Sequence, residues 1–236
     1  MLDILEQLSA WVLPRICVCC GFNSYCLHMD LCLHCKKNLP WLKERCYRCG
    51  LSLDLQHEAI ICVKCRDQPP EFNCLYAMFG YAPPLTKLIN QLKFSKKLNI
   101  GSLLGFLLSE VIVQHWYRQK SLPEVIIPVP LHAKRLRQRG YNQALEICAP
   151  VSKALQIPID TQLCKRIKYT GQQTRLNKTQ RIHNLDKAFL VNSSVSYKHI
   201  AIVDDVVTTA STVRELSIAL RLAGVEIIDV WCVCRA

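Results

Sequence analysis

The fold of this chain is decided by the stretch Ile202-Val203-Asp204-Asp205-Val206-Val207-Thr208-Thr209-Ala210-Ser211-Thr212. Apolar residues predict a buried strand over Ile200–Val203, which ends in two adjacent carboxylates. A loop of small hydroxyl residues follows, and a helix is expected over Thr212–Leu222. Ligands of parallel α/β sheets bind at the carboxyl ends of strands, and the start of a helix attracts anions. The stretch therefore predicts a sugar-phosphate site. The loop would hold the phosphate, and the two aspartates would accept hydrogen bonds from the sugar hydroxyls.

Strand-like and helix-like runs alternate from about residue 72 to the C-terminus, which predicts an α/β sheet. Further strands are expected over Leu75–Tyr81, Val125–Ile127 and Val225–Val233. Further helices are expected over Met1–Val12, Leu85–Lys97, Ile100–Arg118 and Tyr141–Leu155, and Gly224 is expected to stop the helix before it.

The cysteines are concentrated in the first third of the chain. Eleven of the fifteen fall between Cys17 and Cys74, and no basic leader precedes them. The apolar run Ile100–Val113 is interrupted by polar residues and falls short of the ~20 residues of a membrane span. We therefore expect a cytoplasmic protein without direct membrane insertion, in which the cysteines bind metal rather than form disulfides.

Four Cys-x-x-Cys pairs predict two zinc sites, because two such pairs complete one tetrahedron of thiolates. The short gaps within them favour sequential pairing, with one zinc on Cys17, Cys20, Cys32 and Cys35 and the second on Cys46, Cys49, Cys62 and Cys65. Cys19 is an alternative ligand to Cys20. This unit resembles a double zinc ribbon. With the linker Gln68-Pro69-Pro70, the pattern divides the chain into residues 1–70, a zinc-ribbon domain, and residues 71–236, an α/β domain.

The excess positive charge, formally +12 for the chain, is clustered. From Val125 to Lys187 there are twelve Lys or Arg residues against three Asp or Glu. A Pro-rich turn after the strand at Val125 leads to Val129 and then to four cations, Lys134, Arg135, Arg137 and Arg139. Guanidinium groups at such a strand end suit phosphate oxygens, although a solvated basic loop is the alternative.

A polar segment, Gln172–Leu185, is too hydrophilic for the core and too long for a tight connection. A lid over the site is one explanation and disorder is the other.

The Asp-Asp and hydroxyl-loop stretch resembles the signature of type I phosphoribosyltransferases, which bind phosphoribosyl pyrophosphate (PRPP). The resemblance implies that Asp204 and Asp205, as the catalytic pair, accept hydrogen bonds from the ribose hydroxyls. It also implies a 5-phosphate cradle made of Val207, Thr208, Thr209, Ala210, Ser211 and Thr212. Mg²⁺ is implied as a bridge between pyrophosphate and ribose oxygens.

Taken over nearly its whole length, the chain is similar to the ComF family of competence proteins. The similarity runs through the four cysteine pairs, Leu88–Phe94, the Pro-Val-Pro-Leu-His and Arg-Gly-Tyr-Asn-Gln stretches, the polar segment and the Asp-Asp loop. In that comparison the PRPP site includes Val129, Lys134, Arg135, Arg137 and Arg139, and the lid includes Gln173, Thr174, Arg181 and Asn184. Ala210 departs from the pattern, since the family usually has glycine there; alanine suits that position only if its φ is negative.

Three functions follow as hypotheses. The first is a PRPP-binding, phosphoribosyltransferase-like protein of natural transformation that handles incoming single-stranded DNA. A competence helicase or another DNA-processing protein is its expected partner. The second is a catalytically inactive module that binds single-stranded nucleic acid through the clustered charge. The third is a redox or metal sensor built on the cysteines.

Overall fold

A computed structural model describes residues 15–26, 29–53, 61–169, 188–192 and 195–236. Its helices are α2 (Leu33–Lys37), α3 (Val63–Asp67), α4 (Leu85–Phe94), α5 (Leu98–Val111), η1 (Ile112–Trp116, a π-helical turn), α6 (Ala133–Arg139), α7 (Gln143–Leu155) and α9 (Ser211–Leu222). Its strands are β1 (Cys74–Gly80), β2 (Val125–Pro128), β3 (Cys164–Arg166), β4 (Phe189–Val191), β5 (His199–Val207) and β6 (Ile227–Arg235).

Four of these strands form a parallel sheet in the order β1-β6-β5-β2, and β3 and β4 form a separate antiparallel pair. The registers place Gly80 beside Arg235, Val207 beside Arg235, and Pro128 beside Val203. Because all four strands run the same way, their carboxyl ends meet at one edge of the sheet. Ligands of open parallel sheets bind at this edge.

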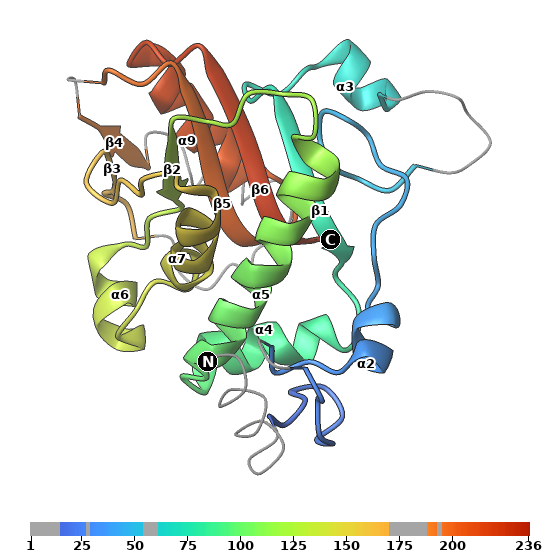
Figure 1. The fold of residues 1–236 in the computed structure, drawn as a ribbon. Coiled ribbons are helices and arrows are strands. Elements are labelled where there is room, and N and C mark those ends of the chain that lie inside the picture. The colour runs from blue at the N-terminus through green and yellow to red at the C-terminus, as the bar shows by residue number, and fades with distance from the viewer. Residues whose placement is uncertain (1–14, 27–28, 54–60, 170–187, 193–194) are drawn as a thin grey trace.

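Helices cover both faces of the sheet (Figure 1). One core contains buried residues of α4, α5 and α7 and the side chains of Ala201 and Val203. A second core contains buried residues of α9 and the side chains of Ile200 and Ile202. Residues of β5 alternate between the two cores because successive side chains of a strand point to opposite faces of the sheet. A strand buried on both faces must be apolar on both, which explains the continuous apolar run in the sequence.

The chain before β1 runs along the exposed edge of that strand. Leu42 donates its N–H to the carbonyl of Met78, Gly80 donates to Pro40, and each N···O distance is 2.9 Å. The Trp41 ring packs on Phe79 with ring centroids 4.5 Å apart. These contacts satisfy backbone groups that an edge strand would otherwise leave open, and they fix the cysteine-rich segment on the sheet.

Most elements expected from the sequence are confirmed, but one strand extends further than expected and one helix was not predicted. The strand predicted over residues 200–203 continues to Val207, so both aspartates lie inside β5 and not after it. The basic run after β2, for which no secondary structure was predicted, contains the helix α6. Gly224 has a φ of 96° after α9 and ends that helix as predicted. The helix expected over residues 1–12 lies outside the described residues.

The apolar run that we expected to be too short for a membrane span belongs to a longer helix. α5 and η1 together cover Leu98–Trp116, 19 residues that by length and composition alone could cross a membrane. Half of this helix is buried inside the protein, where Leu104, Leu107 and Leu108 belong to the core against β1 and α7. A core helix of an α/β sheet has the same composition, because it is apolar on most sides.

Candidate sugar-phosphate site

The two aspartates lie near the carboxyl end of β5 in different surroundings. Asp205 is buried, and its Oδ2 lies 2.9 Å from the Nζ of Lys93 on α4. Asp204 is half-buried and opens into a pocket. Its Oδ1 accepts a hydrogen bond of 2.9 Å from the backbone N–H of Asp205. Loss of water and the neighbouring charge of Asp205 raise the pKa of the Asp204 carboxyl to about 8, although Lys93 acts in the opposite direction.

This raised pKa makes the stability of the ligand-free protein depend on pH. Between about pH 4 and pH 8 the folded state holds a proton on Asp204 that the unfolded state has released, so stability falls as the pH rises. We expect Asp204→Asn to remove this contribution. Urea unfolding at pH 5 and pH 8 should give a stability difference, variant minus wild type, that increases with pH. A stability difference that is the same at both pH values would contradict the raised pKa of Asp204. Asp67→Asn, at the exposed end of α3, is the control.

Residues 208–210 connect β5 to α9 and form the expected loop. Its residues line a small cavity of about 50 Å³ together with Asp204 and the first turn of α9. The Oγ1 of Thr209 lies 2.8 Å from the Oγ of Ser211, so two hydroxyl groups are held together at the start of the helix. The N–H groups of a first helical turn have no acceptor within the helix. The loop thus offers an anion a set of backbone and hydroxyl donors.

Ala210 occupies the N-cap of α9 in a left-handed conformation, with φ 62° and ψ 6°. The condition that would make alanine suitable here, a negative φ, is not met. A non-glycine residue pays roughly 1–2 kcal/mol in this region, whereas glycine adopts it freely.

Ala210→Gly is therefore expected to stabilise the protein by about 0.5–1 kcal/mol, after the greater freedom of glycine in the unfolded chain is subtracted. Chemical denaturation measures the change. A destabilised variant would mean that Ala210 does not have this backbone conformation in solution.

A larger cavity of about 870 Å³ adjoins the loop and shares Asp204, Val206, Thr208 and Thr212 with it. Its walls come from the ends of β1, α4, β2, α6, β3 and β5. The side chains that line it include five cations and several rings and apolar groups: Lys93, Lys96, Arg135, Arg139 and Arg166, with Tyr81, Phe94, Val129, Leu131 and Tyr169. The carboxylate pair, the hydroxyl loop and these cations therefore face one space.

The helix α6 divides the predicted basic residues into two groups. Arg135 and Arg139, four residues apart, lie on one face and line the cavity, as does Val129 before the helix. Lys134 and Arg137 do not line it; Arg137 is exposed, and the Nζ of Lys134 lies 4.8 Å from the centre of the Tyr169 ring. The sequence could not separate these four cations, because no helix was predicted over them and their faces were therefore unknown.

Sequence reasoning missed several residues of the site. Lys93 and Phe94 lie in the Leu88–Phe94 stretch, which was quoted for its resemblance but was given no role. Arg166 and Tyr169 lie within the basic stretch from Val125 to Lys187, and Lys96 lies just after α4; none of the three has a local pattern that would single it out. The lid residues Gln173, Thr174, Arg181 and Asn184 lie outside the described residues.

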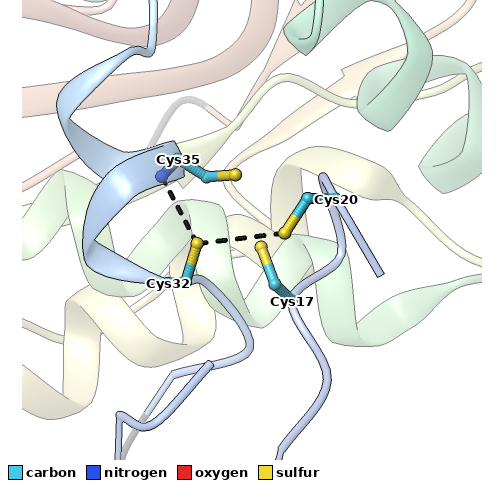
Figure 2. A group of neighbouring side chains, drawn as sticks. All are labelled: Cys17, Cys20, Cys32 and Cys35. Carbon is cyan, nitrogen blue, oxygen red and sulfur yellow. Dashed lines mark hydrogen bonds between the residues drawn. The ribbon is translucent and has the colours of Figure 1, made fainter. Parts of the chain in front are cut away.

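The eight cysteines of the four pairs come together as two groups, with the sequential pairing that was expected. Within each group the four Sγ atoms lie within 4.8 Å of one another. Figure 2 shows the first group, where the N–H of Cys35 donates to the Sγ of Cys32 at 3.4 Å. In the second group the N–H of Cys62 donates to the Sγ of Cys46 at 3.3 Å.

Both groups could hold a metal ion. Four converging sulfur atoms with backbone N–H donors suit a tetrahedral thiolate centre, for which Zn²⁺ is the usual ion. Cys20, and not Cys19, belongs to the first group. Clusters of three or more Cys, His, Asp or Glu ligands are confined to these two groups within the described parts of the chain, so a Mg²⁺ cage made by protein ligands is not supported.

Proteins of similar sequence are known over almost the whole chain. The DNA utilization protein YhgH of Escherichia coli K12 is 37% identical over 223 residues, which cover 94% of this chain and 97% of that protein. Competence protein F of Haemophilus influenzae is 38% identical over 225 residues, which cover 93% of this chain and 96% of that protein. This chain belongs to the ComF family. The resemblance inferred from the motifs is thus confirmed.

No family model matches the sequence of this ComF protein. Solved structures of similar fold include a glutamine PRPP amidotransferase from Bacillus subtilis, with a TM-score of 0.40 and 16% identity over 61% of this chain and 30% of that one. A purine phosphoribosyltransferase from Pyrococcus horikoshii has a TM-score of 0.34 and 17% identity, over 58% of this chain and 83% of that one. These likenesses concern the fold alone. The predicted class, a parallel α/β sheet with an N-terminal cysteine unit, is confirmed.

Proposed function

We propose that this ComF protein binds PRPP in the joined cavities at the carboxyl edge of the sheet and acts in the uptake of DNA. The observation that carries the proposal is the continuity of the two cavities through Asp204, Thr208 and Thr212. A ligand that fills both has one phosphate at the loop, hydroxyls beside the aspartates and further negative charge among the cations. PRPP has these groups in that order.

In this arrangement the loop N–H groups and hydroxyls would hold the 5-phosphate. Asp204 and Asp205 would accept from the ribose hydroxyls, and Arg135 and Arg139 would clamp the pyrophosphate through bidentate bonds. Mg²⁺ would arrive with the ligand, coordinated by pyrophosphate and ribose oxygens, since no protein cage for it is evident among the described residues. Clamping a leaving group in a basic cavity is what a phosphoribosyl transfer requires, and the acceptor is left open.

The remaining parts of the proposal concern the rest of the chain. The two cysteine groups would hold structural zinc, residues 1–70 would form the zinc-ribbon domain and residues 71–236 the PRPP-binding domain, and the protein would act in the cytoplasm. The names of the relatives, DNA utilization protein and competence protein F, support a role in handling incoming DNA.

The two faces of α6 provide a matched test. Arg135→Ala and Arg139→Ala are each expected to weaken PRPP binding by about tenfold or more, the effect of losing hydrogen bonds to a charged group. Arg137→Ala removes the same charge from the same helix but should change the affinity less than about twofold, since exposed charges are screened by salt. Calorimetric titration of PRPP with Mg²⁺ measures all three. If all three variants lost the same amount of PRPP affinity, PRPP would either bind elsewhere or be held only by the overall positive charge.

Binding of single-stranded nucleic acid is the second candidate function, and one feature of the cavity favours it. The rings of Phe94 and Tyr169 are 68% and 44% exposed beside cations, and Arg139 lies over Phe94 at 5.6 Å. Exposed rings among cations allow bases to stack while phosphates are neutralised. Oligonucleotide binding that weakens steeply with salt and is lost in Phe94→Ala would support this function; binding that does not depend on salt would exclude it.

A further inference from the structure

Arg235, the last residue of β6, is a buried guanidinium that connects two parts of the protein. Only 7% of the residue is exposed. Its Nε donates a hydrogen bond of 2.9 Å to the carbonyl of Cys49, and its Nη1 donates to the carbonyl of Val207 at 3.0 Å and also to that of Thr208. One side chain therefore contacts both the second cysteine group and the start of the phosphate loop.

The two contacts are far apart in the chain but serve neighbouring structures. Cys49 contributes its sulfur to the second group while its carbonyl faces Arg235. Val207 ends β5, and Thr208 is the first residue of the loop that lines both cavities. Ala236 adds a backbone N–H bond of 3.0 Å to the carbonyl of Val207, so this strand end is held from two sides.

The buried guanidinium of Arg235 is surrounded by oxygen acceptors. Its Nη1 also donates to the backbone oxygen of Ala236 at 2.6 Å, beside its bonds to Val207 and Thr208. A buried charge is stabilised by hydrogen bonds and by nearby negative charge. A metal-bound Cys₄ centre would keep its sulfurs deprotonated and carry net negative charge, so it would add to this stabilisation on the side of Cys49.

The first cysteine group lies against a different part of the sheet domain. Cys17, Cys32 and Cys35 belong to or lie against the core that contains α4 and α5, and nearby Lys36 pairs with Glu110 on α5 at 2.7 Å. The buried cysteines of the second group form a cluster separate from both main cores. The two groups are therefore attached to different parts of the sheet domain.

We infer that Arg235 is a positioning residue that couples the second cysteine group to the phosphate loop, so that an intact metal centre there holds the loop in its anion-binding geometry. The part of this inference that concerns PRPP rests on the proposed function, whereas the coupling itself does not. Because coupling between sites is reciprocal, an anion bound in the loop would also slow the loss of metal from the second group.

Arg221 offers a matched control at the opposite edge of the sheet. It is also partly buried, and its guanidinium donates to the carbonyls of Glu71 and Val225 at 3.0 and 3.1 Å. None of these hydrogen bonds of Arg221 involves the phosphate loop or a cysteine group. Arg221→Met thus removes a similar set of carbonyl contacts and reports the effect of structural loss alone.

The experiment compares the zinc-loaded wild type with Arg235→Met, Arg235→Lys and Arg221→Met without ligand. Hydrogen–deuterium exchange is followed in the peptide that covers residues 206–213, and zinc release to a chromogenic chelator is timed. Arg235→Met is expected to raise loop exchange by about tenfold, as for the loss of hydrogen bonds to a charged group, and to accelerate release of one of two zinc ions. Arg235→Lys keeps the charge but not the planar guanidinium with its several N–H donors. Its loop exchange and its rate of zinc release should lie between those of Arg235→Met and the wild type.

Loop exchange and zinc release that change equally in Arg235→Met and Arg221→Met would overturn the inference, because the effect would then be general destabilisation. Unchanged loop exchange in Arg235→Met would overturn it as well. A titration with PRPP and Mg²⁺ separates the two proposals: if the wild type does not bind PRPP but the exchange result holds, the proposed function fails and the coupling stands.

Discussion

The Asp204→Asn/Asp205→Asn double variant is expected to bind PRPP at least about 100-fold more weakly than the wild type. Each carboxylate is proposed to accept a hydrogen bond from a ribose hydroxyl, and hydrogen bonds to charged groups contribute about 1.5–3 kcal/mol each. Asparagine keeps the shape of both side chains but loses the charge. Calorimetric titration of PRPP with Mg²⁺ into the zinc-loaded protein measures the loss.

The sign of this effect separates direct contact from general attraction. The cavity has five lining cations, and Lys93 is paired with Asp205 at 2.9 Å. Loss of carboxylate charge makes the cavity more positive and releases Lys93, which by long-range attraction alone would strengthen the binding of any anion. A weaker affinity for PRPP can therefore come only from contacts that need the carboxylates.

Inorganic pyrophosphate, which has no ribose, is the matched probe. Its affinity should be unchanged or higher in the double variant, while that of PRPP falls. Asp67→Asn, at an exposed position of α3, should leave both affinities unchanged. Equal binding of PRPP by the wild type and the double variant would refute the proposed ribose contact.

The second large effect concerns the cysteine groups. The purified protein is expected to contain two zinc ions per chain, and Cys20→Ser or Cys46→Ser should each leave one. Structural zinc in small domains contributes on the order of 10 kcal/mol of binding free energy to folding. Loss of one ion should therefore lower the thermal midpoint by roughly 10 °C or more. Elemental analysis and thermal denaturation measure the two changes.

Cys19→Ser is the control for this prediction, since Cys19 is the neighbour of Cys20 but lies outside the first group. It should keep two zinc ions and a nearly unchanged midpoint. If Cys19→Ser lost one zinc ion while Cys20→Ser kept both, the assignment of Cys20 as the ligand would be wrong. Reversible disulfides with an unchanged fold after mild oxidation would favour the sensor hypothesis instead.

Local patterns predicted the parts of this protein whose geometry is set by neighbours in the chain. A Cys-x-x-Cys pair brings two sulfurs together through one turn, so the ligands of both groups were predicted from spacing, and the structure confirms their pairing. The apolar run of β5 followed by Thr208 and Thr209 likewise predicted a strand, a loop and a helix in sequence. The end of the strand was misplaced, because Val206 and Val207 pair with β6, a contact that local pattern does not reveal.

The basic run after β2 was the clearest failure of local reasoning. Its charged residues and single Leu136 give little apolar periodicity, so the helix α6 was not expected. Without a helix, four cations looked equivalent. The helix places two of them, Arg135 and Arg139, toward the cavity and leaves Arg137 in solvent.

The sequence by itself determined the chemistry of this protein: eight thiols in four pairs, two adjacent carboxylates, a hydroxyl loop and a cluster of positive charge. Only the tertiary structure decided which of these groups meet. Lys93 reaches Asp205 from α4, and Arg235 joins Cys49 to Val207, because parallel strands bring their carboxyl ends to one edge from distant parts of the chain. Contacts of this kind depend on the packing of whole elements, and no spacing within the sequence encodes them locally.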